Sequence, residues 1–185
     1  MDVMDAIHKR RSVRDFASDA VDKAVIRQII DAAVQAPSAI NEQPWRFTVV
    51  QEQATLDRIS SRAKAHLLSA PSGSLPTRLH DILRNPDFQI FYHAPALVVI
   101  SGRADGPWMV EDCALAAENL MLAACAADLG TCWIGFAQGW LQTPEGKKTL
   151  NLPPECLPVA PIIVGRPKSP ASAVPRKDPQ IDWIG

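Results

Sequence analysis

The residues best equipped for chemistry gather near the N-terminus, where three arginines and a serine share a short segment: Arg10, Arg11, Ser12 and Arg14. A phosphate monoester carries close to two negative charges, and each guanidinium offers it a planar pair of N–H donors. A neighbouring hydroxyl can serve a further phosphate oxygen. The cluster therefore suits an anion, although a solvated basic turn at a helix end accounts for the same residues.

A second polar segment follows at 36–45, which reads APSAINEQPW. Its small residues permit close approach to a ligand. The side chains of Ser38, Asn41 and Gln43 can form hydrogen bonds with a flat polar ring. A loop that ends a helix uses Ser and Asn in the same way to satisfy its own backbone, so both interpretations fit the residue types.

Two further segments are less specific. Residues 130–136 read GTCWIGF, which by itself describes a buried strand that ends in a tight turn. Cys132 within it suggests a redox thiol, but a small buried hydrophobic residue is the simpler interpretation. Arg176 and Lys177 lie in a Pro-rich tail, where paired cations are usually solvated.

The first two segments together resemble the nitroreductase family of FMN-dependent oxidoreductases. The family's RRS-x-R segment binds the phosphate and the ribityl chain of FMN. The resemblance therefore implies FMN as a tightly bound, non-covalent cofactor. It assigns this role to Arg10, Arg11, Ser12 and Arg14.

The family's APSxxNxQPW loop comes from a second subunit and packs beside the flavin ring. By this resemblance Pro37 and Ser38 occupy the ring-contacting positions. Asn41 and Gln43 occupy those of the polar pair, with the alternative that Gln43 only holds the loop.

The resemblance also implies that the backbone N–H groups of Ile134 and Gly135 point at flavin N5 and O4, where fixed dipoles stabilise the charge that reduction creates. It places Arg176 and Lys177 on the FMN phosphate. Some members carry Glu where Ile134 stands, so their substrate range is not carried over. The family's mid-chain flavin contacts, an Asn and a Lys, have no recognisable counterpart at 85–90, which contains no Lys.

By the same resemblance, the chain is an intertwined homodimer with two flavins at its interface. NAD(P)H reduces the flavin and leaves, and a nitroaromatic, quinone or similar electron-poor acceptor then takes the electrons in a ping-pong reaction. The flavin carries the chemistry, so no catalytic side chain is expected. The alternatives are a specialised dehalogenase or flavin-fragmenting relative, and a non-catalytic flavin-binding or redox-sensing module.

Composition limits the other possibilities. The chain has 185 residues, of which 47% are hydrophobic and 21% charged, and we expect a single domain over 1–185. A net charge of −1 offers no basic face for nucleic acid. No membrane span, export signal, CxxC pair or metal-ligand spacing is recognisable, so we expect a cytoplasmic protein without a metal. No GxGxxG segment indicates a Rossmann site.

Hydrophobic periodicity predicts five helices, over 1–9, 22–35, 54–68, 110–129 and 143–150. Runs of β-branched and apolar residues predict strands over 46–51, 96–101, 131–136 and 158–164. Asp19 is a plausible N-cap for the second helix. The order of elements is not a repeated βαβ unit, which favours an α+β sandwich with a mixed central sheet. The resemblance implies three layers.

The segment 110–129 is apolar on nearly every side, with Glu111, Asp112, Glu118 and Asn119 as its main polar residues. A helix of this kind must be buried over most of its circumference. We therefore expect part of it to lie in a subunit interface. Residues 166–185 are Pro-rich with few apolar residues and predict an extended C-terminal arm.

Overall fold

A four-stranded sheet forms the centre of the fold in the computed structural model, which describes residues 1–70, 76–103 and 105–185. The strands are β1 (Trp45–Val50), β2 (Ala96–Arg103), β3 (Gly130–Trp133) and β4 (Cys156–Gly165), in the order β1-β2-β4-β3. The neighbouring strands pair antiparallel. The α+β prediction is confirmed. The mixed sheet is corrected: within the described ranges the parallel pairing is an isolated bridge between Ser12 and Thr131.

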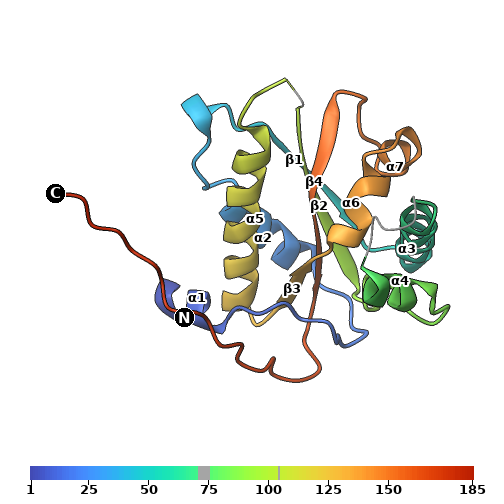
Figure 1. The fold of residues 1–185 in the computed structure, drawn as a ribbon, viewed down its shortest axis with the longest axis horizontal. Coiled ribbons are helices and arrows are strands. Elements are labelled where there is room, and N and C mark those ends of the chain that lie inside the picture. The colour runs from blue at the N-terminus through green and yellow to red at the C-terminus, as the bar shows by residue number, and fades with distance from the viewer. Residues whose placement is uncertain (71–75, 104) are drawn as a thin grey trace.

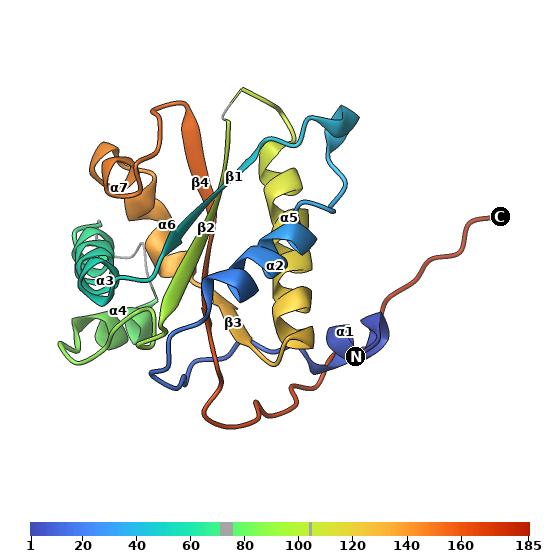
Figure 2. The ribbon, with the colours of Figure 1, turned by 180° about the vertical axis from the view of Figure 1, so that it is seen from behind.

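Helices cover both faces of this sheet, which gives the expected three layers (Figures 1 and 2). One face carries α2 (Lys23–Ala33) and α5 (Met109–Ala126), with α1 (Val3–Lys9) packed against α5. The other face carries α3 (Gln53–Leu68), α4 (Thr77–Arg84), α6 (Gly135–Leu141) and α7 (Pro144–Thr149). A short turn, η1 (Ala39–Asn41), precedes β1.

The two central strands are apolar because both of their faces are covered. Along β2, Leu97 and Val99 pack with the α3 and α6 layer, whereas Val98 and Ile100 pack with the α2 and α5 layer. This alternation follows from the two-residue period of a strand. The register of β2 with β4 shifts after Ile100, as expected of a β-bulge.

Three sequence expectations change. The N-cap of α2 is Asp22, whose side chain accepts from the Ala24 amide, and not Asp19. The strand expected at 131–136 stops at Trp133, and α6 begins at Gly135. The helix α4 was not expected. It has only 8 residues, too short for a clear apolar period.

The helix α5 is buried on one face by its own chain. Its buried residues include Cys113, Ala117 and Leu120. Gly102 on β2 permits this approach, since a Cβ there would collide with Met109. The opposite side stays open: Val110 is 49% and Leu115 is 46% exposed.

Candidate cofactor-binding site

The arginine segment is fastened between β3 and the start of the C-terminal arm. The Val13 amide donates to the Thr131 carbonyl at 2.9 Å. Gly130 makes room for this pairing, because a Cβ there would lie 2.7 Å from the Val13 side chain. Further on, the Ala17 amide donates to the Arg166 carbonyl at 2.9 Å. The polar side chains of 10–14 are thus presented along the edge of the sheet.

The cluster divides between two hollows. Arg10 and Arg11 line one of about 320 Å³, which also takes in the first residues of the arm, Pro167 and Pro170. The Arg10 Nε lies 3.6 Å from the carboxylate of Glu118 on α5.

Arg11 turns back on its own backbone. Its Nη1 donates to the carbonyls of His8 and Arg10, at 2.5 and 2.7 Å. Its Nε is buried and has no hydrogen-bond partner among the residues that the structure describes. Buried donors are rarely left unpaired, so this N–H is a group that a bound anion could satisfy.

Arg14 belongs to the second hollow, of about 310 Å³, where it faces the end of β3 and the start of α6. The lining residues are Arg14, Tyr92, Cys132, Trp133, Ile134, Gly135 and Phe136. A Cβ built on Gly135 would meet no atom within 4 Å, so the backbone is open to the hollow at this point.

Of the two amides expected to face a ligand, one is engaged elsewhere. The Ile134 N–H donates to the Pro161 carbonyl at 2.8 Å and so continues the sheet. This bond engages the Ile134 N–H within the sheet, and its role towards the flavin stays a prediction. Gly135 is the first residue of α6, where an N–H has no acceptor within the helix. Gly135 remains the donor available to a ligand.

Cys132 lines the second hollow together with Arg14. Burial raises the pKa of the Cys132 thiol, while the charge of Arg14, a hydrogen bond with the Ser12 side chain and the charge of Arg10 act in the opposite direction. A buried thiol with a raised pKa is a poor nucleophile, so Cys132 is a wall of the hollow.

The 37–43 loop is held together by its own polar groups. The Ser38 Oγ accepts from the backbone N–H of Gln43 at 3.0 Å, and the side-chain Nε2 of Gln43 donates to the Asn41 Oδ1 at 3.0 Å. Asp112 on α5 accepts from the Ala39 amide, also at 3.0 Å. Within one chain, Ser38 and Gln43 thus form hydrogen bonds that hold the loop together, as their residue types also allow.

This loop and the arginine cluster do not meet within one chain. The loop is tied to Asp112 in the first turn of α5, whereas Arg10 pairs with Glu118 further along that helix and 130–135 follows its end. With 18 residues, α5 is about 27 Å long. Figures 1 and 2 show the loop near one end of α5 and α1 near the other.

The arm leaves the body beside α1 and extends away from it (Figure 1). Lys168 is anchored by an ion pair with Asp15 at 3.1 Å. Arg176 and Lys177 lie beyond this point and are exposed. They do not reach the arginine cluster of their own chain, since only the arm's first residues line the hollow of Arg10 and Arg11.

The structure adds Tyr92 to the site and brings Lys64 to the 85–90 segment, and the sequence singled out neither residue. Tyr92 lines the hollow of Arg14, although nothing in its sequence neighbourhood indicated this. Lys64 of α3 donates to the carbonyls of Asn85 and Phe88 at 2.7 and 2.6 Å. A lysine thus does reach the 85–90 segment, from a helix distant in sequence.

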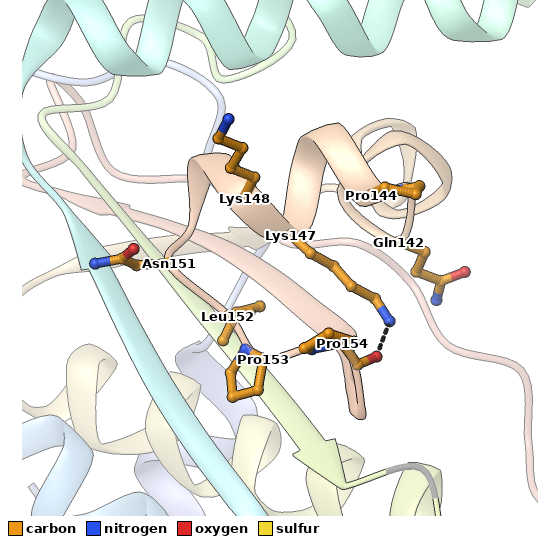
Figure 3. Close-up of a pocket in the computed structure, with 8 residues that line it drawn as sticks. All are labelled: Gln142, Pro144, Lys147, Lys148, Asn151, Leu152, Pro153 and Pro154. Atoms are coloured by element: carbon orange, nitrogen blue, oxygen red, sulfur yellow. Dashed lines mark hydrogen bonds between the residues drawn. The ribbon is translucent and has the colours of Figure 1, made fainter.

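A third hollow, of about 450 Å³, lies at the far end of α6 (Figure 3), lined by Gln142, Pro144, Lys147, Lys148, Asn151, Leu152, Pro153 and Pro154. The Lys147 Nζ donates to the Pro154 carbonyl at 2.6 Å. The side chain of Lys148 points away from it. The hydrogen bond of Lys147 ties α7 to the following loop, so the hollow is explained by the packing of the chain.

Two classes of site have no counterpart in the part of the chain that the structure describes. No group of three or more His, Cys, Asp or Glu side chains is placed to hold a metal ion. In the same ranges, no helix has the length and apolar character needed to cross a membrane.

Comparison with known proteins gives a consistent result. The pattern described as "Nitroreductase family" matches residues 7–166. A protein of Methanothermobacter thermautotrophicus, named for NADH dehydrogenase and NAD(P)H nitroreductase activities, is 29% identical over 172 residues, which cover 90% of this chain and 78% of that protein.

Two solved structures share the fold. A nitroreductase with bound FMN from Bacteroides fragilis superposes with a TM-score of 0.84 at 25% identity, covering 100% of this chain and 98% of the other. An iodotyrosine deiodinase bound to FMN and 3-iodo-L-tyrosine superposes with a TM-score of 0.78 at 25% identity, with 100% of both chains covered.

Proposed function

Because the chain belongs to the nitroreductase family, we propose that it is an FMN-dependent oxidoreductase that takes hydride from NAD(P)H. It passes the electrons to nitroaromatics, quinones or similar electron-poor acceptors in a ping-pong reaction. The name of the archaeal relative supports the NAD(P)H and nitro-compound assignments. The bound FMN of the Bacteroides structure supports the cofactor.

The observation that carries the proposal is the open backbone at Gly135, where a Cβ would meet nothing within 4 Å. A flat ring requires such close approach to the main chain. The hollow also contains the Arg14 guanidinium and the first amide of α6. A planar, electron-accepting ring fits these groups, since a cation and an N–H dipole both favour the added negative charge.

The rest of the cofactor fits the other hollow. Arg10 and Arg11 supply positive charge there, and the buried Nε of Arg11 provides a donor for a phosphate oxygen. Ser12 lies between Arg11 and Arg14 in the chain and is exposed, and its hydroxyl suits the ribityl hydroxyls. When bound, FMN supplies the hydride and electron chemistry, and the chain binds the cofactor, orients it and shields one side of it.

The proposal includes a homodimer in which each flavin is bound by both subunits. In one chain the 37–43 loop is tied to Asp112 in the first turn of α5, whereas Arg10 pairs with Glu118 near the middle of that helix and Val13 pairs with Thr131 beyond its end. A second copy can bring its Pro37, Ser38, Asn41 and Gln43 to the flavin. The arm at 166–185 can likewise bring Arg176 and Lys177 to the phosphate.

We also infer a single domain over residues 1–185 and a cytoplasmic location. The four cysteines are free thiols, as is usual in reducing compartments.

Flavin absorbance tests the proposal directly. The purified protein, reconstituted with FMN, should bleach when NADH or NADPH is added without oxygen. The yellow colour should return on addition of a quinone or a nitroarene. A flavin that stays oxidised with both nucleotides would instead support a binding or sensing module. A protein that takes up no FMN would contradict the proposal.

The deiodinase likeness favours one second candidate, reductive dehalogenation. That reaction replaces a carbon–halogen bond by carbon–hydrogen, using two electrons and a proton, and it releases halide. Dithionite-reduced protein mixed with 3-iodo-L-tyrosine should then release iodide in proportion to the flavin present. Absence of iodide, with rapid reoxidation by a nitroarene, would leave the first proposal standing.

A further inference from the structure

Tyr92 has a backbone that bulky residues rarely adopt. Its φ is 52°, and that of His93 is 54°, so two consecutive residues that are not glycine are left-handed. Such strain persists only where the neighbouring structure enforces it, and it concentrates at functional sites. Here the enforcement comes from both sides: Phe91 is fully buried and Ala94 is 1% exposed.

The strained turn delivers the Tyr92 ring to Arg14. The guanidinium carbon of Arg14 lies 6.0 Å from the centre of the ring, within the range of a cation–π contact. The Phe88 ring meets Tyr92 edge-on, with centroids 5.6 Å apart and an interplanar angle of 79°. Lys64 in turn lies 5.9 Å from the Phe88 centroid, and its bonds to backbone carbonyls fix this end of the stack.

The contacts of Arg14 show what can orient its side chain. Among the residues that the structure describes, Arg14 forms no ion pair and no side-chain hydrogen bond. Its side chain is exposed, so without the ring it would sample many rotamers in solvent. Tyr92 and Arg14 both line the hollow that contains Gly135.

We propose that Tyr92 is a positioning residue of the cofactor site, whose ring holds the Arg14 guanidinium over the hollow at Gly135. The proposal rests on the proposed function, because it takes FMN as the ligand that Arg14 meets. It requires the ring and not the hydroxyl, since a cation–π contact is made with the face of the ring.

A double-mutant cycle with FMN dissociation constants tests the proposal. Tyr92→Leu should weaken FMN binding about two- to fivefold, the equivalent of one exposed cation–π contact. Tyr92→Phe should bind FMN as the wild type does. In an Arg14→Ala background, Tyr92→Leu should have no further effect, because the group that it positions is gone.

Two controls separate positioning from damage to the fold. Phe136→Leu shortens another wall of the same hollow, and its effect on FMN binding should add to that of Arg14→Ala. Tyr92→Asn removes the ring but suits a left-handed backbone, so it should keep the thermal midpoint of the apoprotein closer to wild type than Tyr92→Leu does and still weaken FMN binding.

Three results would overturn the proposal. One is wild-type affinity in Tyr92→Leu, and another is equal losses from Tyr92→Leu with and without Arg14. The third is a Tyr92→Phe variant as weak as Tyr92→Leu. A wild-type chain that binds no FMN would contradict the proposed function and, with it, the role of Tyr92. A wild type that binds FMN while the cycle is additive would remove only the role of Tyr92.

Discussion

Among single residues, the glycine that opens α6 provides a sharp test of the cofactor hollow. Gly135→Ala places a methyl group where the chain itself has no atom within 4 Å. The free energy of unfolding of the apoprotein should rise by about 0.4–1 kcal/mol, because the unfolded chain loses freedom. FMN binding should weaken by about 1–3 kcal/mol, the range for overpacking. Denaturant unfolding and flavin titration measure the two effects.

Gly139→Ala on the same helix is the matched control. Its Cβ would lie 3.6 Å from the His66 ring, an ordinary contact outside the hollow. This variant should bind FMN as the wild type does. If Gly135→Ala also binds FMN normally, the ligand does not approach α6 here.

Arg10 should contribute to binding through the phosphate of the cofactor. Arg10→Ala is expected to weaken FMN binding by roughly 1.5–3 kcal/mol, as for a hydrogen bond to a charged group. The affinity for riboflavin, which lacks the phosphate, should fall less than the affinity for FMN. Glu118→Gln is the control, since it removes the ion pair at 3.6 Å and leaves the guanidinium. Equal losses of affinity for FMN and for riboflavin would show that Arg10 has a structural role and does not bind the phosphate.

The buried Cys113 thiol is expected to lower the stability of the fold at alkaline pH. Burial, with a further contribution from the charge of Asp112, raises the pKa of the Cys113 thiol from 9.0 to about 12. Above pH 9 the unfolded chain releases this proton while the folded chain retains it, so the free energy of unfolding falls as pH rises towards 12.

Urea unfolding at a series of pH values from 8 to about 11 measures this effect. The decline should be smaller in Cys113→Ala, which has no thiol to titrate, than in the wild type. Parallel profiles for the two proteins would show that other groups cause the alkaline loss.

Among the elements, α5 and the 37–43 loop are joined through one buried carboxylate. Asp112 is 3% exposed and accepts from the Ala39 amide at 3.0 Å. Its Oδ2 has no partner within the described part of the chain. Asp112→Ala should lower the free energy of unfolding by about 1–3 kcal/mol, because the Ala39 N–H loses its acceptor. It should also make the loop more sensitive to proteolysis.

Asp112→Asn is the informative comparison, since its amide oxygen still accepts from Ala39. Its loop should resist protease as the wild type does. If Asn and Ala variants are cleaved equally fast, the carboxylate charge matters more than the hydrogen bond.

The sequence revealed the elements with a long or strongly patterned apolar period, which are α2, α3, α5 and the central strands. It did not reveal α6, because two glycines in seven residues conceal a helix. The arginine cluster was visible from residue types alone. Tyr92 and Asp112 were not, because their contacts join residues far apart in the chain: Asp112 and Ala39 are 73 positions apart.

For the whole molecule, the exposed apolar residues indicate where a second copy would pack. Many of them lie on α1, on the open side of α5 and on the arm: Val3, Met4, Ile7, Val110, Leu115, Ile181, Trp183 and Ile184. Ile40 of the 37–43 loop is also 85% exposed. Trp183 is 90% exposed, which leaves a large apolar ring in water. Ala117, by contrast, is fully buried within its own chain, so it does not report on an interface.

Leu115→Glu therefore tests the proposed dimer. In a monomer, this change at a 46% exposed position would alter the free energy of unfolding by no more than about 0.5 kcal/mol. In a dimer it buries an unpaired carboxylate, at a cost of several kcal/mol, and separates the subunits. Flavin should be lost with the dimer, because in the proposed dimer each 37–43 loop reaches the flavin of the other subunit. Size-exclusion chromatography and the flavin-to-protein absorbance ratio measure both effects, with Leu115→Ala as the milder control. A wild-type protein that runs as a monomer with one FMN per chain would refute the shared site.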